Sequence, residues 1–342
     1  MHSRSALNSL RYLLSLTPGT LVIAGNLLGG WWSLANTIYT MVLLFGIERI
    51  LKENKKVNDI DDGAVPNAIL SAHVILHTMT IVSLIYGIYT SILVGKFIWY
   101  ASVSTGISSG IEGINSAHEL IHRKQWYARI AGIWNLLLVN YSHFYIEHVK
   151  GHHRYIGTPR DPATARFNES FYRYFVRTVP AQYKSAFSIE AERLKKNKNS
   201  KGYLMNNTVV QLTFIQIGIC ATITFFFGWI SLIAYLNQSL IAFFLLEYVN
   251  YIEHYGLVRK EGLKVNATHS WQSDMPISRF ALIELSRHSD HHITASKPYY
   301  KLVNYEESPM LPSGYFGSFY TALFPSSHRI IKRCYKHFLI YF

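Results

Sequence analysis

The sequence predicts an all-α integral membrane protein with six transmembrane helices and a cytoplasmic, histidine-rich helical cap. Three observations lead to this fold class: the composition, the length of the uncharged segments and the placement of the charges. Of the 342 residues, 49% are hydrophobic and 15% are aromatic, yet the formal net charge is +13. A nucleic-acid-binding protein would share the charge but not the long uncharged runs. We therefore expect contact with membrane lipid and no contact with nucleic acid.

Two long uncharged segments define most of the predicted spans. Residues 17–47 and 202–246 contain no Asp, Glu, Lys or Arg. At ~1.5 Å per residue, each segment is too long to cross a ~30 Å hydrocarbon core once, so each is predicted to form a helical hairpin. The hairpins should turn near residues 29–32 and between residues 228 and 238, where Gly, Asn and Trp suit a membrane interface.

Two further apolar stretches, about residues 66–95 and 97–120, complete the predicted membrane domain. The shorter stretch 130–146 is interpreted as a helix that dips into the membrane or lies under the bundle, because a crossing there would move the later basic segments to the other side. The six predicted spans are about residues 10–30, 31–50, 66–95, 97–120, 203–227 and 229–253, and the cap comprises 121–202 and 254–342, all in one domain covering 1–342.

The position of the charged residues predicts the orientation in the membrane. With six spans, the N-terminal tail, the loop ERILKENKKVNDIDD, residues 147–201 and everything after about residue 253 share one side and hold nearly all Lys and Arg. Loops rich in Lys and Arg stay in the cytoplasm. We expect a multi-pass protein of the cytoplasmic (inner) membrane, without a cleavable signal peptide. Both termini and the histidine motifs should face the cytoplasm.

Four histidine motifs lie at this predicted cytoplasmic face: HELIH, EHVKGHH, NYIEHYG and RHSDHH. Spacings of three and four residues place imidazoles on one face of a helix. The histidines exceed the four ligands of a structural zinc and suit two metal ions with an open position. Without thiolates, the ligand type leaves iron, zinc, copper and nickel open. The candidate metal ligands are His118, His122, His148, His152, His153, His254, His288, His291 and His292.

Other polar residues near these motifs are candidates to support the ligands. A metal-bound histidine usually donates its outward nitrogen to a carboxylate or a carbonyl. Residues adjacent on a helix diverge by about 100°, so an adjacent glutamate can also point elsewhere. His73, His77 and His143 are expected to be structural, hydrogen-bonded or packed within the bundle. The candidates to hold ligand histidines are Glu119, Glu147, Glu253, Asp290 and His269.

These motifs carry a resemblance to a known family. HELIHRK, EHVKGHHRYIGTPRDPATAR, NYIEHYGLVR, HSWQSD, LSRHSDHH and LPSGYFG resemble the membrane alkane 1-monooxygenases, which include xylene monooxygenase and are distant relatives of the fatty-acid desaturases. The resemblance implies two iron ions (Fe2+/Fe3+) held by the nine histidines, O2 as co-substrate, and electrons from rubredoxin and its NAD(P)H-dependent reductase. One departure is Gln272-Ser273-Asp274, where the family usually has Asn-Ser-Asn.

The resemblance and the residues together predict a hydroxylase that converts the terminal methyl of an alkane or a similar hydrocarbon to a primary alcohol. The hydrocarbon should enter from the bilayer through an apolar passage. Alternatives on the same scaffold are hydroxylation of an aromatic methyl group and desaturation of an acyl chain. A metal transporter is the alternative from another class, but it would place its ligands near the bilayer midplane. The basic residues 195–198 could attract anionic lipid or an acidic electron carrier.

Overall fold

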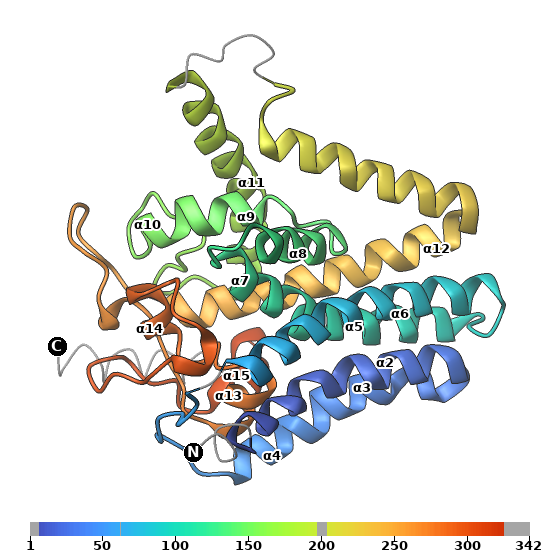
Figure 1. Ribbon diagram of the computed structural model, residues 1–342, viewed down its shortest axis with the longest axis horizontal. Coiled ribbons are helices and arrows are strands. Elements are labelled where there is room, and N and C mark those ends of the chain that lie inside the picture. Colours follow the sequence, from blue (N-terminus) through green and yellow to red (C-terminus); the bar gives the residue numbers. More distant parts are fainter. Residues whose placement is uncertain (1–6, 62, 197–203, 325–342) are drawn as a thin grey trace.

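A computed structural model describes residues 7–61, 63–196 and 204–324. Within these residues the chain forms helices and loops, and the sole strand-like pairing is an isolated bridge between Gln272 and Met310. Long helices extend side by side toward one end of the molecule, and short helices gather at the other end (Figure 1). The prediction of an all-α protein is confirmed.

The first helical hairpin turns where the sequence predicts it. Gly29 and Gly30 have φ angles of +69° and +54°, which glycine adopts without the steric cost of a side chain. The next hairpin packs against this turn, since a Cβ on Gly29 would lie 2.7 Å from the carbonyl oxygen of Ile92. The hairpin comprises η1 (Leu10–Leu16), α2 (Thr17–Leu28), η2 (Gly30–Leu34), α3 (Ala35–Ile38), η3 (Tyr39–Leu44) and α4 (Phe45–Ile50).

The second hairpin lies between the first hairpin and the last long helix. Its first arm is α5 (Ala64–Tyr89), and its second arm is α6 (Lys96–Ser108), the π-helical η4 (Ser109–Ile114) and α7 (Asn115–Ile121). The glycine of α6 allows close packing with α12, because a Cβ on Gly106 would lie 2.6 Å from the carbonyl oxygen of Gln238.

The last long helix, α12 (Thr208–His254), bends sharply at Gly228. The φ and ψ angles there are 80° and 169°, a region that is essentially restricted to glycine. The bend divides α12 into two arms, and the second arm runs along α6 (Figure 1). The turn predicted between residues 228 and 238 therefore lies at Gly228, the first residue of that range.

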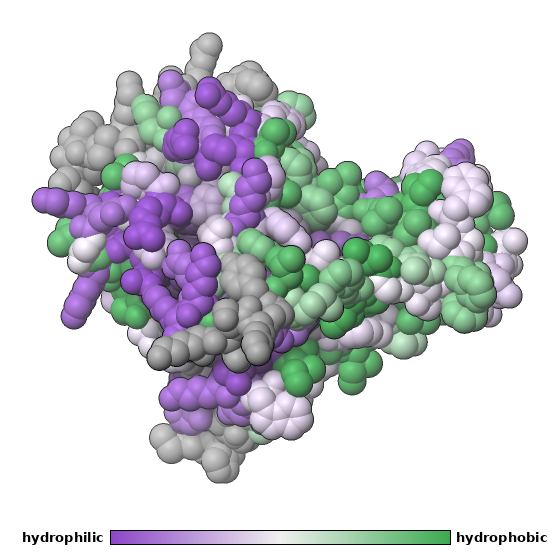
Figure 2. Space-filling model, turned by 90° about the horizontal axis from the view of Figure 1, so that it is seen from above, coloured by the Kyte–Doolittle hydropathy of each residue, from purple (hydrophilic) through white to green (hydrophobic). Residues whose placement is uncertain are grey.

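Two of the helices, α5 and α12, are long and apolar enough to cross a membrane by length and composition. The six-span arrangement is therefore not established, because 3-10 and π-helical segments divide the remaining arms into shorter regular helices. The hydropathy of the surface nevertheless changes along the long axis. Hydrophobic residues dominate the extended arms, and hydrophilic residues gather over the opposite end (Figure 2).

The stretch 130–146, predicted as one helix, is divided in the structure. Helix α8 (Trp126–Leu137) ends before Asn140, which has a φ of +53°, and the short α9 (Phe144–Ile146) follows. An asparagine tolerates this left-handed conformation better than most residues, which explains why the helix stops there. Helix α8 packs against α7, so it lies beside the bundle rather than extending it.

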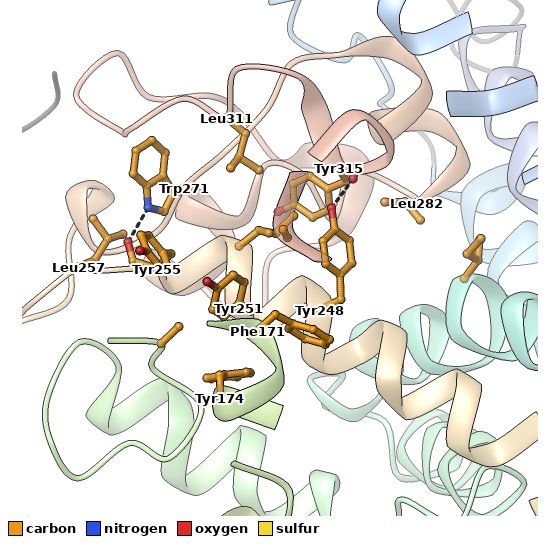
Figure 3. Close-up of a cluster of buried hydrophobic side chains, with 14 of the residues drawn as sticks. Phe171, Tyr174, Tyr248, Tyr251, Tyr255, Leu257, Trp271, Leu282, Leu311 and Tyr315 are labelled. Atoms are coloured by element: carbon orange, nitrogen blue, oxygen red, sulfur yellow. Dashed lines mark hydrogen bonds between the residues drawn. The ribbon is translucent and has the colours of Figure 1, made fainter. Parts of the chain in front are cut away.

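The remaining helices form a compact cap at one end of the bundle. An aromatic cluster joins this cap to α12, and Trp271 donates a hydrogen bond of 3.1 Å from its indole nitrogen to the carbonyl oxygen of Tyr255 (Figure 3). The cap helices are η5 (Glu147–His152), α10 (His153–Tyr155), α11 (Phe171–Lys196), η6 (Ala267–His269), α13 (Pro276–Ala281), α14 (His288–Ile293), η7 (Tyr299–Lys301) and α15 (Gly314–Leu323).

The residues that depart from the family pattern are part of the framework of this cap. The side-chain amide of Gln272 donates to the carbonyl oxygen of Tyr305 at 2.6 Å, and its backbone pairs with the 309–311 segment. Asp274 accepts from the fully buried Arg287 at 3.2 Å. Both residues therefore hold the cap segments together.

Candidate metal centre

The nine histidines of the four motifs meet in two groups at the junction of the long helices and the cap. Within each group, one nitrogen of every imidazole lies within 4.8 Å of the others. One group contains His118, His122, His148, His153 and His291, and the other contains His152, His254, His288 and His292.

A π-helical turn sets the position of three of these histidines. In η5 the backbone N–H of His153 bonds to the carbonyl oxygen of His148, five residues earlier. A spacing of five residues would diverge on an α-helix, but a π-helical turn brings both imidazoles to one side. The Nε2 atoms of His148 and His153 are 3.1 Å apart as a result. His152 lies between them in sequence and belongs to the other group.

Close contacts between imidazole nitrogens run through both groups. His291 Nε2 is 3.1 Å from His153 Nε2, and His292 Nε2 is 2.9 Å from His288 Nε2. Two neighbouring nitrogens bound to one metal ion at about 2.1 Å would be separated by about 3 Å, so these spacings suit a shared metal ion. The Nε2 atoms of His118, His122, His152 and His254 are buried and have no hydrogen-bond partner within the described residues.

The electrostatic environment keeps most of these imidazoles neutral. Burial, together with the nearby His152, lowers the pKa of His122 to about 4. Burial and the neighbouring histidines also hold the pKa of His153 and His292 well below the usual range. A neutral imidazole presents the lone pair that a metal ion requires. Buried, unpaired and neutral nitrogens converging in this way fit a pair of metal ions.

Asp161 supports His152, and the sequence interpretation did not identify it. Its Oδ2 atom is 2.9 Å from His152 Nδ1, and it also accepts from the Thr164 hydroxyl at 2.6 Å. Burial alone would lower the pKa of His152, but the charge of Asp161 raises it overall. The sequence signal that could have identified Asp161 is the acidic residue in the segment GTPRDP. This segment turns back toward His152.

His269 and Glu253 contact candidate ligand histidines, but not through the contacts that the sequence suggests. The carbonyl oxygen of His269, and not its imidazole, lies 3.3 Å from His254 Nδ1. The His269 ring instead accepts from the backbone N–H of Asn266. Glu253 reaches His288 rather than its neighbour in sequence, with 3.1 Å between Oε2 and Nε2.

Two of the other three support candidates, Glu119 and Asp290, have partners elsewhere in the described residues. Glu119 pairs with Arg123 and accepts from the backbone N–H of Tyr299. Asp290 binds Lys297 at 2.6 Å and the backbone N–H of Val303 at 2.8 Å. Adjacency in sequence fails here because neighbouring side chains on a helix point in different directions.

Glu147 lies against the backbone of its own π-helix. A Cβ on Gly151 would be 2.7 Å from its Oε2 atom, and burial raises the pKa of Glu147 to about 7. It makes no hydrogen bond to any of the nine histidines in the described part of the chain.

The histidines interpreted as structural lie outside both groups. His73 Nε2 is 2.8 Å from the Ser15 hydroxyl, which links α5 to η1. His77 is fully buried, and its ring occupies the space beside Gly113. His143 packs edge-on against Tyr141, with ring centroids 4.3 Å apart.

An apolar passage leads to the histidines. It has about 830 Å³ of empty space, part of which is open to solvent, and His118, His148 and His288 are among its lining residues. These three side chains are almost fully buried, whereas Met41, Gly110 and Leu245 on the same walls are partly exposed on the bundle surface. The passage therefore borders members of both histidine groups and also partly exposed residues of the bundle.

Comparison with known proteins gives a consistent result. Residues 96–320 match the family model described as fatty acid desaturase. The chain is 35% identical over 262 residues to alkane 1-monooxygenase 1 of Pseudomonas aeruginosa, a match that covers 70% of this chain and 68% of that protein. This chain belongs to the alkane 1-monooxygenase family.

Further members of the monooxygenase group match over shorter shares of their length. Alkane 1-monooxygenase 1 of Alcanivorax borkumensis is 38% identical over 244 residues, covering 69% of this chain and 59% of that protein. The xylene/toluene monooxygenase hydroxylase component of Pseudomonas putida is 29% identical over 205 residues, covering 60% and 55%. As a member of the alkane 1-monooxygenase family, the chain falls in the class of oxygen-dependent hydroxylases.

Proposed function

We propose that this protein hydroxylates the terminal methyl group of an alkane or a similar hydrocarbon chain, with O2, two electrons and two protons, to give a primary alcohol and water. The observation that carries the proposal is the apolar passage that ends at His118, His148 and His288. Nothing along most of its wall would bind a polar substrate, and each methylene buried there contributes roughly 0.8 kcal/mol.

The two histidine groups would each hold one iron ion. The five-membered group is His118, His122, His148, His153 and His291, and the four-membered group is His152, His254, His288 and His292. Bound iron supplies the oxygen-activating chemistry that an unactivated C–H bond requires. The chain itself orients His152 through Asp161 and His254 through the carbonyl oxygen of His269. The buried walls exclude water from the methyl end of the substrate.

The relatives and the family model favour particular alternatives on the same scaffold. The xylene/toluene monooxygenase component supports hydroxylation of an aromatic methyl group, and the fatty acid desaturase model supports desaturation of an acyl chain. A metal transporter is disfavoured because the histidines gather where the helices meet the cap.

The electrons would come from a separate carrier. The sequence holds two cysteines, too few for the four-cysteine site of a rubredoxin, and no Gly-rich dinucleotide fingerprint. We infer that rubredoxin and its NAD(P)H-dependent reductase serve the enzyme from the cytoplasm. The chain would then lie in the inner membrane in six spans, with both termini and the metal centre on the cytoplasmic side.

The test measures iron and product together. Protein purified in detergent should bind close to two irons and form octanol from octane with O2, NADH, reductase and rubredoxin. His152→Ala should lose iron and activity while still inserting in the membrane. His73→Ala is the matched control, since its imidazole bonds to Ser15 outside both groups, and it should keep its iron. A preparation that binds iron but leaves octane, xylene and acyl chains unchanged would overturn the proposal.

A further inference from the structure

The Glu253 carboxylate lies where the apolar passage meets the four-histidine group. Glu253 and His288 both line the passage, and Glu253 Oε2 is 3.1 Å from His288 Nε2. The same His288 nitrogen is 2.9 Å from His292 Nε2. One carboxylate oxygen and two imidazole nitrogens therefore converge within this group.

The nitrogen that Glu253 contacts is the one that faces the metal site. His152 and His254 use Nδ1 for outward contacts to Asp161 and to the His269 carbonyl, which leaves their buried Nε2 atoms unpaired. Nε2 is thus the inward atom of His152 and His254, and His288 and His292 approach each other within the same group through their Nε2 atoms. A carboxylate that only orients a ligand histidine accepts from its outward nitrogen. Glu253 is on the inward side of His288 instead.

A neutral donor fixes Glu253 in this position. The Tyr315 hydroxyl donates to Glu253 Oε1 at 2.7 Å, and the backbone N–H of Tyr315 donates to the Ser278 hydroxyl at 2.7 Å. Both side chains are about 1% exposed. Within the described residues, no Lys or Arg forms an ion pair with Glu253. A buried carboxylate without a cation is costly, whereas a metal ion beside Oε2 would neutralise it.

We propose that Glu253 is itself a metal ligand, the fifth protein donor of the group His152, His254, His288 and His292, and that Tyr315 positions it. The inference rests on the proposed metal centre. It gives each metal ion five protein donors: five nitrogens in one group, and four nitrogens with one carboxylate oxygen in the other. A hard oxygen donor suits iron, and it makes the two ions chemically distinct.

The test uses 57Fe2+ added to the metal-free protein without O2, read by iron content and Mössbauer spectroscopy, with no turnover required. The parent should show two quadrupole doublets of equal area. Glu253→Gln should change or remove one doublet and lower the affinity of that ion at least about tenfold, leaving the other doublet unchanged. Glu119→Gln is the matched control, because this buried glutamate also adjoins a candidate ligand histidine, His118, but pairs with Arg123. Its spectrum should equal that of the parent.

A second variant keeps the inference testable if Glu253→Gln fails to fold. Tyr315→Phe keeps the carboxylate but removes its hydroxyl donor, so it should shift the same doublet and retain both irons. The assignment would be overturned if Glu253→Gln bound two irons and gave an unchanged spectrum. If only Tyr315→Phe folds, the same result in that variant would overturn it. Failure of the parent to bind two irons would instead count against the proposed function, so the two failures are distinguishable.

Discussion

At the scale of single residues, Asp161 has a defined role in orienting His152. Its two oxygens accept from the His152 ring, the Thr164 hydroxyl and the backbone N–H of Ala163. The carboxylate is therefore rigid, and it directs His152 Nε2 toward the other histidines of its group. Carboxylates of this kind contribute about 10-fold to 100-fold to metal affinity.

Replacing Asp161 by Asn should reduce iron affinity in the four-histidine group by about 10-fold to 100-fold, since an amide cannot hold the ring with the same charge. Titration of the metal-free protein with Fe2+ measures this. Asp290→Asn is the control: Asp290 also adjoins ligand histidines, but its carboxylate holds Lys297 and Val303. Equal losses of affinity in both variants would contradict the assigned role of Asp161.

The residue scale also shows what the sequence can predict. The convergence of the nine histidines was predictable from their short spacings and from the placement of all four motifs at one predicted membrane face. Their partners do not follow, because Asp161 lies nine positions from His152 and reaches it only through the turn after α10. The partner of His254 is a backbone carbonyl, which no side-chain pattern reveals.

At the scale of elements, glycines lie at the reversals of the chain, and the π-helical turn η5 sets the positions of three histidines. The turn at Gly29 and Gly30 and the bend at Gly228 are at predicted places, because only glycine tolerates their φ angles at low cost. The π-helical turns of η4 and η5 were not predicted, since their sequences fit an ordinary α-helix equally well. The interruptions they cause also explain why fewer long regular helices are present than the predicted spans.

Replacing Gly228 by Val should destabilise the bend of α12 by about 1–3 kcal/mol, because a branched residue does not adopt a φ of 80° with a ψ of 169°. The free energy of unfolding in detergent measures the effect. Gly218→Ala, in the same helix, is the control. A Cβ there has no atom within 4 Å, so stability should change by less than about 1 kcal/mol. Equal stability of the two variants would show that the bend imposes no strain.

At the scale of the whole molecule, the separation of hydrophobic and hydrophilic surfaces predicts the topology (Figure 2). The Gly29–Gly30 turn lies between uncharged helices, whereas α11 carries exposed basic residues that include Lys195 and Lys196. The remaining two residues of the basic stretch 195–198 lie outside the described part of the chain. The positive-inside rule therefore predicts a periplasmic position for the turn and a cytoplasmic position for α11.

Single cysteines test this orientation in a Cys220→Ser, Cys334→Ser background. A membrane-impermeant maleimide should label Gly30→Cys in intact cells, and should label Glu192→Cys, near the end of α11, only after the cells are opened. Labelling of Glu192→Cys in intact cells would invert the topology and place the histidines away from a cytoplasmic reductant.

The charge of the whole molecule governs how it would meet an electron carrier. Several basic residues are exposed on the cap, among them Arg154, Arg160, Arg166 and Lys184. Such a surface attracts an acidic carrier, and the attraction weakens as the Debye length falls from ~10 Å at 0.1 M salt to ~3 Å at 1 M. Binding of the hydrocarbon in an apolar passage lacks this electrostatic contribution.

Raising salt should therefore slow octanol formation when rubredoxin limits the rate, and it should change the apparent affinity for octane far less. The rate is measured at limiting and at saturating rubredoxin across a salt series, with reductase in excess and its own activity followed separately. Because saturation compensates for weaker docking, the salt effect should largely disappear at high carrier concentration. A salt-independent rate at limiting carrier would refute electrostatic docking, and octanol formed at full rate without rubredoxin would refute the need for a separate carrier.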